Sequence, residues 1–284
     1  MDLINGFPRS PYARLHNVVS LPSTIDKIRA DLNGTLGEYV WQSGFSKWLI
    51  DFLGVHQDAT RDAIATRPDD DSVWEWLQQN MQPRTNEDIA RFNRDMIERR
   101  WSPERASRIQ ELCESIGKPG VSDIVTYFEW QDLEENRQAE YQSEPIDLSV
   151  TPPRDPYQKL LGLVNLPRTL DKARAELAGT TGDYIWRTGQ SLLLLDFLGL
   201  TPDELFEALR TDHSDKSMCE WISSNMLSRS DVEIAFFNRG AIQNYPVTAD
   251  RMEAHERMLT DAGLAPMTTI TTAFERLCWD DALL

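Results

Sequence analysis

Apolar residues recur at helical spacing through much of the chain. In the first predicted helix, Ile25, Ile28 and Leu32 fall on one face, and Gly34 follows at a position where glycine commonly ends a helix. Alternation of β-branched residues, which would indicate strands, is not sustained anywhere. The pattern therefore predicts an all-α protein.

The later predicted helices have clearer boundaries. A second helix runs from Phe45 to Gly54, and its counterpart from Leu192 to Gly199 is apolar nearly all round, which favours a central, buried position. A third is predicted at 72–81 and again at 217–226. The fourth begins at a capping box, and this signal occurs twice, at Thr85 with Asp88 and at Ser230 with Glu233. We expect about five or six helices in each half.

The two halves of the chain are copies of one another. Pro11 aligns with Pro156, an offset of 145 residues (156 − 11), and from Pro11 to Gly54 the copies agree at 24 of 44 positions without a gap. Two homologous helical domains are therefore expected, at 1–137 and 155–284, joined by a proline-rich linker at 138–154. Such copies usually pack as a pseudo-dimer with pseudo-two-fold symmetry, and independent domains on the linker are the alternative.

Size and charge limit the number of domains and the classes of partner that we expect. The 284 residues correspond to about two domains. A formal net charge of −17 repels nucleic-acid phosphates and anionic membrane surfaces, so we expect neither as a partner. No apolar run approaches the ~20 residues of a membrane span, and the first residues do not resemble a signal peptide. The three scattered cysteines form no disulfide or zinc pattern, and the expected location is the cytoplasm.

The repeated stretch carries a family likeness. It reads Leu-Pro-x-x-x-Asp-Lys-x-Arg-Ala-x-Leu-x-Gly-Thr-x-Gly, then an acid and Tyr, and later Asp-Phe-Leu-Gly. It resembles a bacterial family known as domain of unknown function 5069, and the likeness covers both halves, about 10–135 and 155–280. The resemblance implies helical domains of this size and no particular reaction. The first copy departs from the family spelling at Ser23, Ile28 and Asn33, which puts it in doubt if only one half is functional.

The repeated helix carries the first candidate site residues. At about 100° per residue, Lys27 lies opposite the apolar stripe and Asp26 flanks it. One interpretation is a surface lysine with an aspartate favoured by the helix dipole. The other interpretation is that the aspartate and the lysine belong to a functional site, which faces the second domain or a pocket. The arginine two residues after the lysine would belong to the same site. Across both copies these candidates are Asp26, Lys27, Arg29, Asp171, Lys172 and Arg174.

An aspartate interrupts the apolar second helix in each copy. In a buried helix an unpaired carboxylate is costly, so it is neutralised or paired with a cation, for which the first helix offers its lysine or arginine. The pair is either a structural ion pair or an acid–base carboxylate with a raised pKa. The candidate catalytic residues are therefore Lys27, Asp51, Lys172 and Asp196.

Aromatic and amide side chains complete the candidate set. The aromatic residues either fill the core or form the wall of a pocket for a flat or cationic ligand. The asparagines lie on apolar helix faces and either fix a loop carbonyl or contact a ligand. These residues are Tyr39 and Tyr184, Trp41 and Trp186, Trp76 and Trp221, and Asn93 and Asn238.

Several sharper motifs are absent. The histidines occupy no matched positions and show no metal-ligand spacing, and the glycine pairs of the repeat are not followed by the Lys-Ser/Thr of a phosphate loop. The acidic run at 69–71 is expected to be a solvated turn and helix cap. We therefore expect no metal and no cofactor.

These patterns favour a protein that binds a small organic molecule, flat or charged, beside the Asp-Lys-x-Arg helix. A cofactor-independent enzyme is the favoured form, in which lysine orients an anionic group or relays protons and the aspartate acts as base. The alternative is a non-catalytic module that docks a protein partner through its repeated surface. Self-association into a homo-oligomer is compatible with either.

Overall fold

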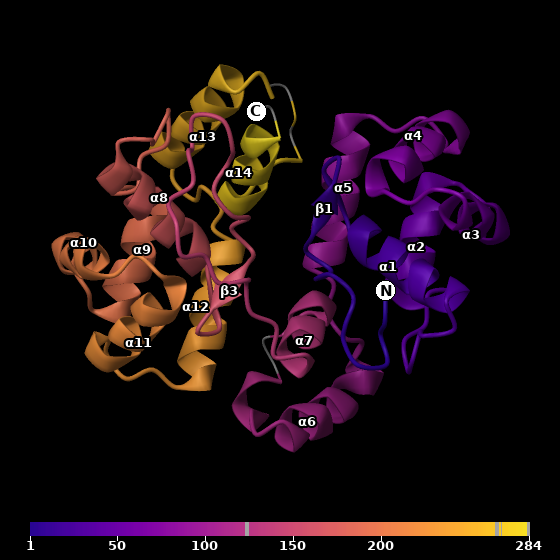
Figure 1. The fold of residues 1–284 in the computed structure, drawn as a ribbon, viewed down its shortest axis with the longest axis horizontal. Helices are drawn as coiled ribbons and strands as arrows, with labels where there is room; N and C mark the ends of the chain where they lie inside the picture. Colours follow the sequence, from indigo (N-terminus) through magenta and orange to yellow (C-terminus); the bar gives the residue numbers. More distant parts are fainter. Residues whose placement is uncertain (123–124, 265–266, 268, 283–284) are drawn as a thin grey trace. The chain divides into compact units, whose positions relative to one another are not determined.

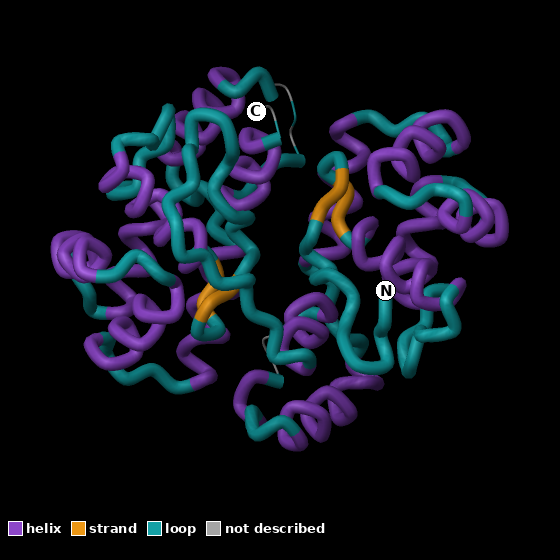
Figure 2. The backbone as a smooth tube through the Cα atoms, in the orientation of Figure 1, coloured by secondary structure: helices purple, strands orange, loops and turns teal. Residues whose placement is uncertain are grey.

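The computed structural model describes residues 1–122, 125–264, 267 and 269–282. Within these residues each repeat is an antiparallel hairpin of two-residue strands followed by seven α-helices, which confirms the all-α prediction (Figures 1 and 2). The first repeat contains β1 (Arg14–Leu15), β2 (Val18–Val19), α1 (Leu21–Leu32), α2 (Gly44–Leu53), α3 (Gln57–Ala65), α4 (Asp70–Asn80), α5 (Asn86–Ile97), α6 (Ala106–Ser115) and α7 (Tyr127–Glu134). The second contains β3 (Lys159–Leu160), β4 (Leu163–Val164), α8 (Leu166–Ala178), α9 (Gly189–Leu198), α10 (Pro202–Thr211), α11 (Asp215–Asn225), α12 (Asp231–Ile242), α13 (Ala249–Asp261) and α14 (Ala273–Asp281).

Many helix ends follow the signals in the sequence. Gly54 and Gly199 end α2 and α9 with φ angles of 68° and 70°, a left-handed conformation that suits glycine. The capping boxes that begin at Thr85 and Ser230 are both present. The expected five or six helices per repeat is too few, since each repeat has seven, and α3 and α10 are among those that were not anticipated. A signal was available there, since α10 begins at a capping box on Thr201.

Asparagine side chains on α5 and α12 hold the hairpins in place. Asn93 Oδ1 accepts a hydrogen bond from the Val19 amide at 3.1 Å, and its Nδ2 donates to the Asn17 carbonyl at 2.6 Å. Asn238 makes the same two bonds to the hairpin of its own repeat, at 3.1 and 2.8 Å. Both asparagines therefore fix loops, and the interpretation that they contact a ligand is not supported, because backbone groups occupy their amides.

The first helix of each repeat lies at the centre of its unit. Helix α1 packs against α2, α3 and β1, and α8 packs against α9, α10 and β3. Because neighbours surround them, the side chains at 21–28 and at 166–175 are buried on every face of the helix. Lys27 and Lys172 are only 6% and 9% exposed, so the interpretation of these residues as surface lysines is wrong.

The second helix of each repeat corrects another expectation. Helix α9 is not buried all round, since Leu192 and Leu193 are exposed and only its Ser191, Leu194, Leu195 and Leu198 face is buried. Asp196 lies on the exposed side. Asp51 is exposed too, and its carboxylate pairs with Lys47 on the same helix at 2.6 Å. The expected burial of these two aspartates against the first helix is therefore wrong, because apolar composition here does not mean contact on every side.

The described residues form two compact units that do not follow the repeats throughout. Unit 1 consists of 1–103, 125–136 and 265–270, and unit 2 consists of 104–124, 137–264 and 271–284. Near the end of the chain Phe128 corresponds to Phe274, an offset of 146 (274 − 128), so 265–270 is the equivalent of 119–124. Each unit thus contains a short segment that the repeat pattern assigns to the other copy.

Specific bonds hold these segments. Within unit 1, the Thr269 amide donates to Glu87 Oε1 at 3.1 Å. Within unit 2, Lys118 Nζ pairs with Asp231 Oδ1 at 2.6 Å. The proline-rich stretch 138–154 also belongs to unit 2, where Leu148 is buried, so it forms part of that unit and not only a spacer.

None of the described helices is both long enough and apolar enough to cross a membrane.

We predict that separating the repeats destabilises both units. Cutting between 137 and 138 takes 265–270 away from unit 1 and 104–124 away from unit 2. Each half alone should melt at a lower temperature than the full chain when followed by circular dichroism. Mixing the two halves should restore much of the loss, and halves that melt like the intact chain would contradict this assignment of segments.

Candidate functional site

A buried lysine in the second repeat is the centre of the most unusual cluster. Lys172 lies near the middle of α8, and its Nζ donates to the Ile185 carbonyl at 3.3 Å. Burial and the positive charge of Arg168 together lower the pKa of this amine to about 8, against the opposing charge of Asp281. A lysine with such a pKa carries an appreciable neutral fraction near physiological pH.

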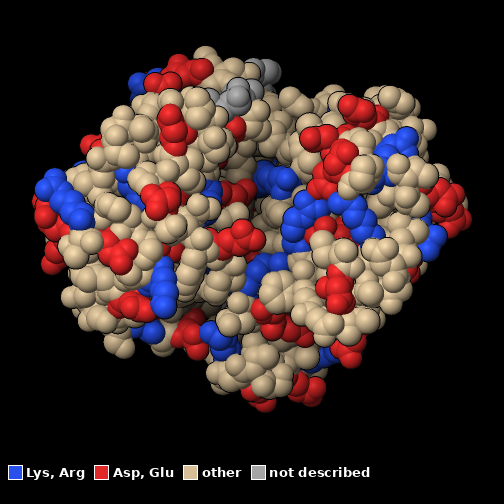
Figure 3. All heavy atoms as spheres, viewed as in Figure 1, with Lys and Arg blue, Asp and Glu red and all other residues tan. Residues whose placement is uncertain are grey.

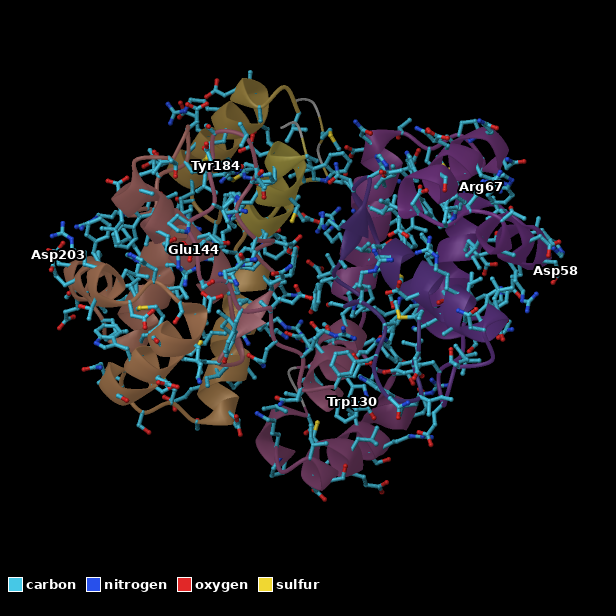
Figure 4. All side chains as sticks on the ribbon, in the orientation of Figure 1. Asp58, Arg67, Trp130, Glu144, Tyr184 and Asp203 are labelled. Carbon is cyan, nitrogen blue, oxygen red and sulfur yellow. The ribbon has the colours of Figure 1, made fainter. Side chains whose placement is uncertain are left out.

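A tyrosine, a carboxylate and an arginine lie beside this lysine. Tyr184 lies close to α14 (Figure 4), and its hydroxyl donates to Asp281 Oδ1 at 2.9 Å. Arg168 forms a two-pronged ion pair with the same carboxylate at 2.7 and 2.9 Å. Burial and the negative charge of Asp281 raise the pKa of Tyr184, so the phenol stays protonated.

A second arginine gives the cluster an excess of positive charge. Arg276 on α14 is half-buried, and its Nε is fully buried without a hydrogen-bond acceptor among the described residues. Burial lowers the pKa of Arg276, Asp280 opposes this, and the charge of Arg168 adds to it. Three cationic side chains therefore share two carboxylates, those of Asp280 and Asp281. An anion is the kind of ligand that such a cluster lacks.

The first repeat keeps the lysine and tyrosine but not the arginines. Lys27 Nζ lies 5.8 Å from the centre of the Tyr39 ring, and the Tyr39 hydroxyl donates to Glu135 Oε1 at 2.7 Å. Ser23 stands at the position of Arg168, and Trp130, in the middle of α7 (Figure 4), stands at that of Arg276. The two copies therefore share a frame and differ in charge.

The other charged residues of the motif form a separate, fully paired network. In the second repeat Asp171 accepts from Arg154 at 2.7 Å, and Arg154 also pairs with Asp215 at 2.6 Å. Arg174 closes the network through Asp215. Burial on its own would raise the pKa of Asp215, but hydrogen bonding to Arg154 and the charge of Arg174 outweigh it and lower that pKa.

The first repeat contains an equivalent network, in which the arginine is more exposed to solvent. Arg9 pairs with Asp26 at 2.8 Å and with Asp70 at 2.6 Å, and Arg29 pairs with Asp70 at 2.8 Å. The cap predicted for the acidic run is confirmed, because Asp69 accepts from the Ser72 amide, whereas its neighbour Asp70 has this further role. All four charges of each network have partners, so the networks hold segments together. One buried nitrogen of Arg29, Nη2, makes no hydrogen bond among the described residues.

The tryptophans of the candidate set belong to the core or its margin. Trp41 and Trp186 are almost completely buried. Trp186 stacks on Phe206 with ring centres 5.5 Å apart. Trp76 and Trp221 are half-buried, and Trp221 packs against the hydrophobic core of unit 2. For the tryptophans, the core-filling interpretation fits these positions.

Several members of the cluster and network escape sequence reasoning. Arg154, Asp215, Arg276 and Asp281 lie far from the repeated motif in the chain and reach it only through folding. A signal existed for Arg168, which belongs to the Pro-Arg spelling that the first copy lacks. Arg154 and Asp215 also had one, because arginine and aspartate stand 145 residues earlier, at positions 9 and 70.

Two further observations concern possible metal ligands and the charge of the surface. Within the part of the chain that the structure describes, no group of three or more His, Cys, Asp or Glu side chains could hold a metal ion. On the face shown in Figure 3, acidic side chains are spread over both units, and basic side chains lie among the acidic ones.

We predict that breaking the buried network destabilises unit 2. Replacing Arg154 by Gln leaves Asp171 and Asp215 buried with one cation fewer, which should lower the free energy of unfolding by about 3–5 kcal/mol. The matched Arg9→Gln variant should cost less, because the Arg9 side chain is 42% exposed and water can replace part of its contacts. Urea denaturation measures both, and equal losses would contradict the difference in burial.

The same network predicts a pH dependence. Because the pKa of Asp215 is lower in the folded than in the unfolded protein, its contribution is fully present above the ordinary aspartate pKa. It is lost as the pH falls through the lowered value. Thermal melts in acid should therefore show a smaller loss of stability for Asp215→Asn than for the wild type.

We predict that Lys172 costs the protein stability at neutral pH. Its pKa drops from 10.5 unfolded to about 8 folded, so the unfolded state binds more protons between these values and stability rises with pH across that range. Below about pH 8 the cost is roughly 3 kcal/mol. Lys172→Met should raise the melting temperature at about pH 7, and this gain should shrink towards about pH 10. The exposed Lys216→Met change should show no such effect.

Comparison with known proteins places the chain in a family. No curated protein matches the chain. The sequence model of one family matches twice, over residues 5–137 and 150–282, and so covers most of both repeats. The chain belongs to the family described as domain of unknown function 5069, of which it is a tandem-repeat member.

Proposed function

We propose that the second repeat binds a small organic anion and that Lys172 acts on it as a general base in a cofactor-independent reaction. The observation that carries this proposal is a buried amine whose pKa is lowered to about 8, in a cluster where three cationic side chains share two carboxylates and Arg276 Nε has no acceptor among the described residues. The helix-two aspartates, Asp51 and Asp196, are not part of this site.

The lysine suits proton transfer. A general base works best when its pKa lies near the operating pH, and an ordinary lysine is almost entirely protonated there. The low pKa of Lys172 has two physical sources, burial and the neighbouring Arg168 charge, and this combination is typical of functional sites. The hydroxyl of Tyr184 donates its one hydrogen to Asp281 and so holds that carboxylate beside the lysine.

The arginines suit an anionic substrate. Arg276 Nε lacks an acceptor among the described residues, and a carboxylate or phosphate oxygen would supply one. Arg168 pairs with Asp281 through its two terminal nitrogens, and its buried Nε makes no hydrogen bond among the described residues. Tyr184, Arg276 and Asp281 are the partly exposed members of the cluster, and a substrate would meet them first.

The stability cost of the lysine supports a functional role. A methionine at the same position would fill similar space without the charge, so packing alone does not require an amine there. Proteins commonly retain such destabilising groups where activity depends on them.

A second candidate function is a non-catalytic docking module. Ile185, Leu192 and Leu193 of the second repeat are exposed, and the first repeat has the charged Lys47 at the position of Leu192. Exposed apolar side chains of this kind favour contact with another protein. The lysine cluster is not explained by this function, so we place it second.

We also propose a cytoplasmic location. The three cysteines, Cys113, Cys219 and Cys278, are buried and form no disulfide with one another, which suits a reducing compartment.

Lysine labelling tests the proposal. The reactivity of Lys172 toward an amine-specific acylating reagent, read by mass spectrometry of its peptide, should rise with a midpoint near pH 8, as expected from its lowered pKa. The exposed Lys216 serves as the reference lysine in the same digest. A midpoint shared by the two residues would remove the base from the mechanism.

Ligand screening tests the anion. Small carboxylates and organic phosphates, screened by thermal shift on the full chain, should include compounds that stabilise it and that slow Lys172 labelling. Arg276→Gln should weaken the best compound by about 10-fold or more, the usual effect of losing one charge-assisted hydrogen bond. The matched change Arg210→Gln, at an exposed residue of α10, should leave its binding unchanged.

A further inference from the structure

Lys172 lies beside a carboxylate that other side chains already occupy. Arg168 donates to both oxygens of Asp281, at 2.7 and 2.9 Å, and Tyr184 donates to one of them at 2.9 Å. Among the described residues, the lysine amine donates only to the neutral Ile185 carbonyl, at 3.3 Å, and forms no ion pair. The amine is therefore held in place, and the loss of its proton breaks no ion pair.

The amine also lies next to an exposed segment of the chain. Its acceptor belongs to Ile185, which is 65% exposed and follows Tyr184 in the loop before α9. Tyr184, Arg276 and Asp281 are half-buried. The stem of Lys172 is thus buried, while its reactive end adjoins a part of the surface that a small molecule can reach.

Two arginine nitrogens of this cluster have no acceptor. Arg168 and Lys172 stand four residues apart on α8, so their side chains share one face of the helix. The Nε atoms of Arg168 and Arg276 are both buried without a hydrogen bond among the described residues. The charge of Arg168 acts on both Lys172 and Arg276, so the three cations belong to one cluster. A carboxylate oxygen would supply the acceptor that each Nε lacks.

We infer that Lys172 forms an imine with a small 2-oxo acid, whose carboxylate accepts hydrogen bonds from the Nε groups of Arg168 and Arg276. This inference rests on the anion site of the proposed function, and it differs in that the lone pair of Lys172 attacks carbon in place of a proton. A lysine becomes nucleophilic toward carbonyl groups when it is desolvated or lies next to another cation, and both conditions hold here. In a 2-oxo acid the carboxylate adjoins the carbon that bonds to Nζ, which brings it toward an arginine one helical turn away.

The reaction balances without an oxidant or a reductant. The unprotonated amine attacks the carbonyl carbon, a C–N bond forms, and the carbonyl oxygen takes up the proton that the nitrogen releases. One further proton from the solvent lets this oxygen leave as water, and the product is a protonated imine.

Charge balance selects the class of substrate. Arg168, Lys172 and Arg276 carry three positive charges against the two negative charges of Asp280 and Asp281. A protonated imine keeps the charge of the lysine, and one carboxylate supplies the third negative charge. A phosphate ester brings about −1.5 to −2 at about pH 7 and exceeds what is needed, whereas a neutral ketone brings none. A monoanionic 2-oxo acid is therefore the class that fits.

Reductive trapping on the full chain tests the imine. Pyruvate with sodium cyanoborohydride should attach one reduced pyruvate to Lys172, read by mass spectrometry of its peptide, well before the exposed Lys216 is modified. Acetone, which has the carbonyl but no carboxylate, should be trapped about 10-fold more slowly or less. Lactate, which has the carboxylate but no carbonyl, should compete with pyruvate, and Lys172→Met should abolish the early product.

Variants test the arginines. Arg276→Gln should slow the trapping of pyruvate by about 10-fold and leave that of acetone unchanged, because only pyruvate has a carboxylate to lose its donor. Arg210→Gln, at an exposed position, should change neither. The first repeat provides an internal control, since Ser23 and Trp130 stand where the second repeat has its two arginines. Lys27 should therefore show no preference for pyruvate over acetone.

Separate readouts distinguish the imine from the anion site. If lactate slows the acylation of Lys172 but pyruvate is not trapped there, the imine is overturned and the anion site stands. If pyruvate is not trapped and neither acid slows acylation, both are overturned. Equal trapping at Lys172 and Lys216, or equal trapping of pyruvate and acetone at Lys172, also overturns the imine.

Discussion

The burial of charged side chains in the central helices is the constraint on which the rest of each unit depends. Asp171 lies in a helix without an exposed face, and an unpaired carboxylate there would cost several kcal/mol. Arg154 provides the partner from a segment that precedes the whole hairpin, and Asp215 joins the same network from α11. A stretch rich in proline thereby becomes part of the fold, because the ion pair ties it to the helix.

The two repeats show how one frame supports different electrostatics. Both keep the lysine and the tyrosine–carboxylate pair, yet the second adds Arg168 and Arg276 where the first has Ser23 and Trp130. The charge of Arg168 adds to burial in lowering the pKa of the nearby lysine. Duplication followed by a few substitutions thus gives one frame two different charge environments.

The sequence predicts those site residues that lie close together in the chain, and it misses those that only folding brings together. Lys172 and Tyr184 are found within one repeated motif, because residues that stay close in the chain stay close in the fold. Asp281 is found only in the structure, since nothing local links the last helix to the first. Asp196 shows the opposite failure: its apolar neighbours predict burial, but they form the exposed side of a helix that packs through another face.

The sequence by itself determined the duplication, the helical class, most helix ends and the family, because these follow from identity between copies, from local spacing and from capping, which act within a few residues. The tertiary structure alone decided which faces are buried, that the repeated lysines lie inside the unit, and which distant charges meet them. Burial depends on how many neighbours surround a helix, and periodicity along one helix carries no information on that number. The pKa of Lys172 is the clearest case, since its motif supplies the amine and Arg168, whereas the fold supplies the burial, which is the largest cause of the shift, and the Asp281 charge.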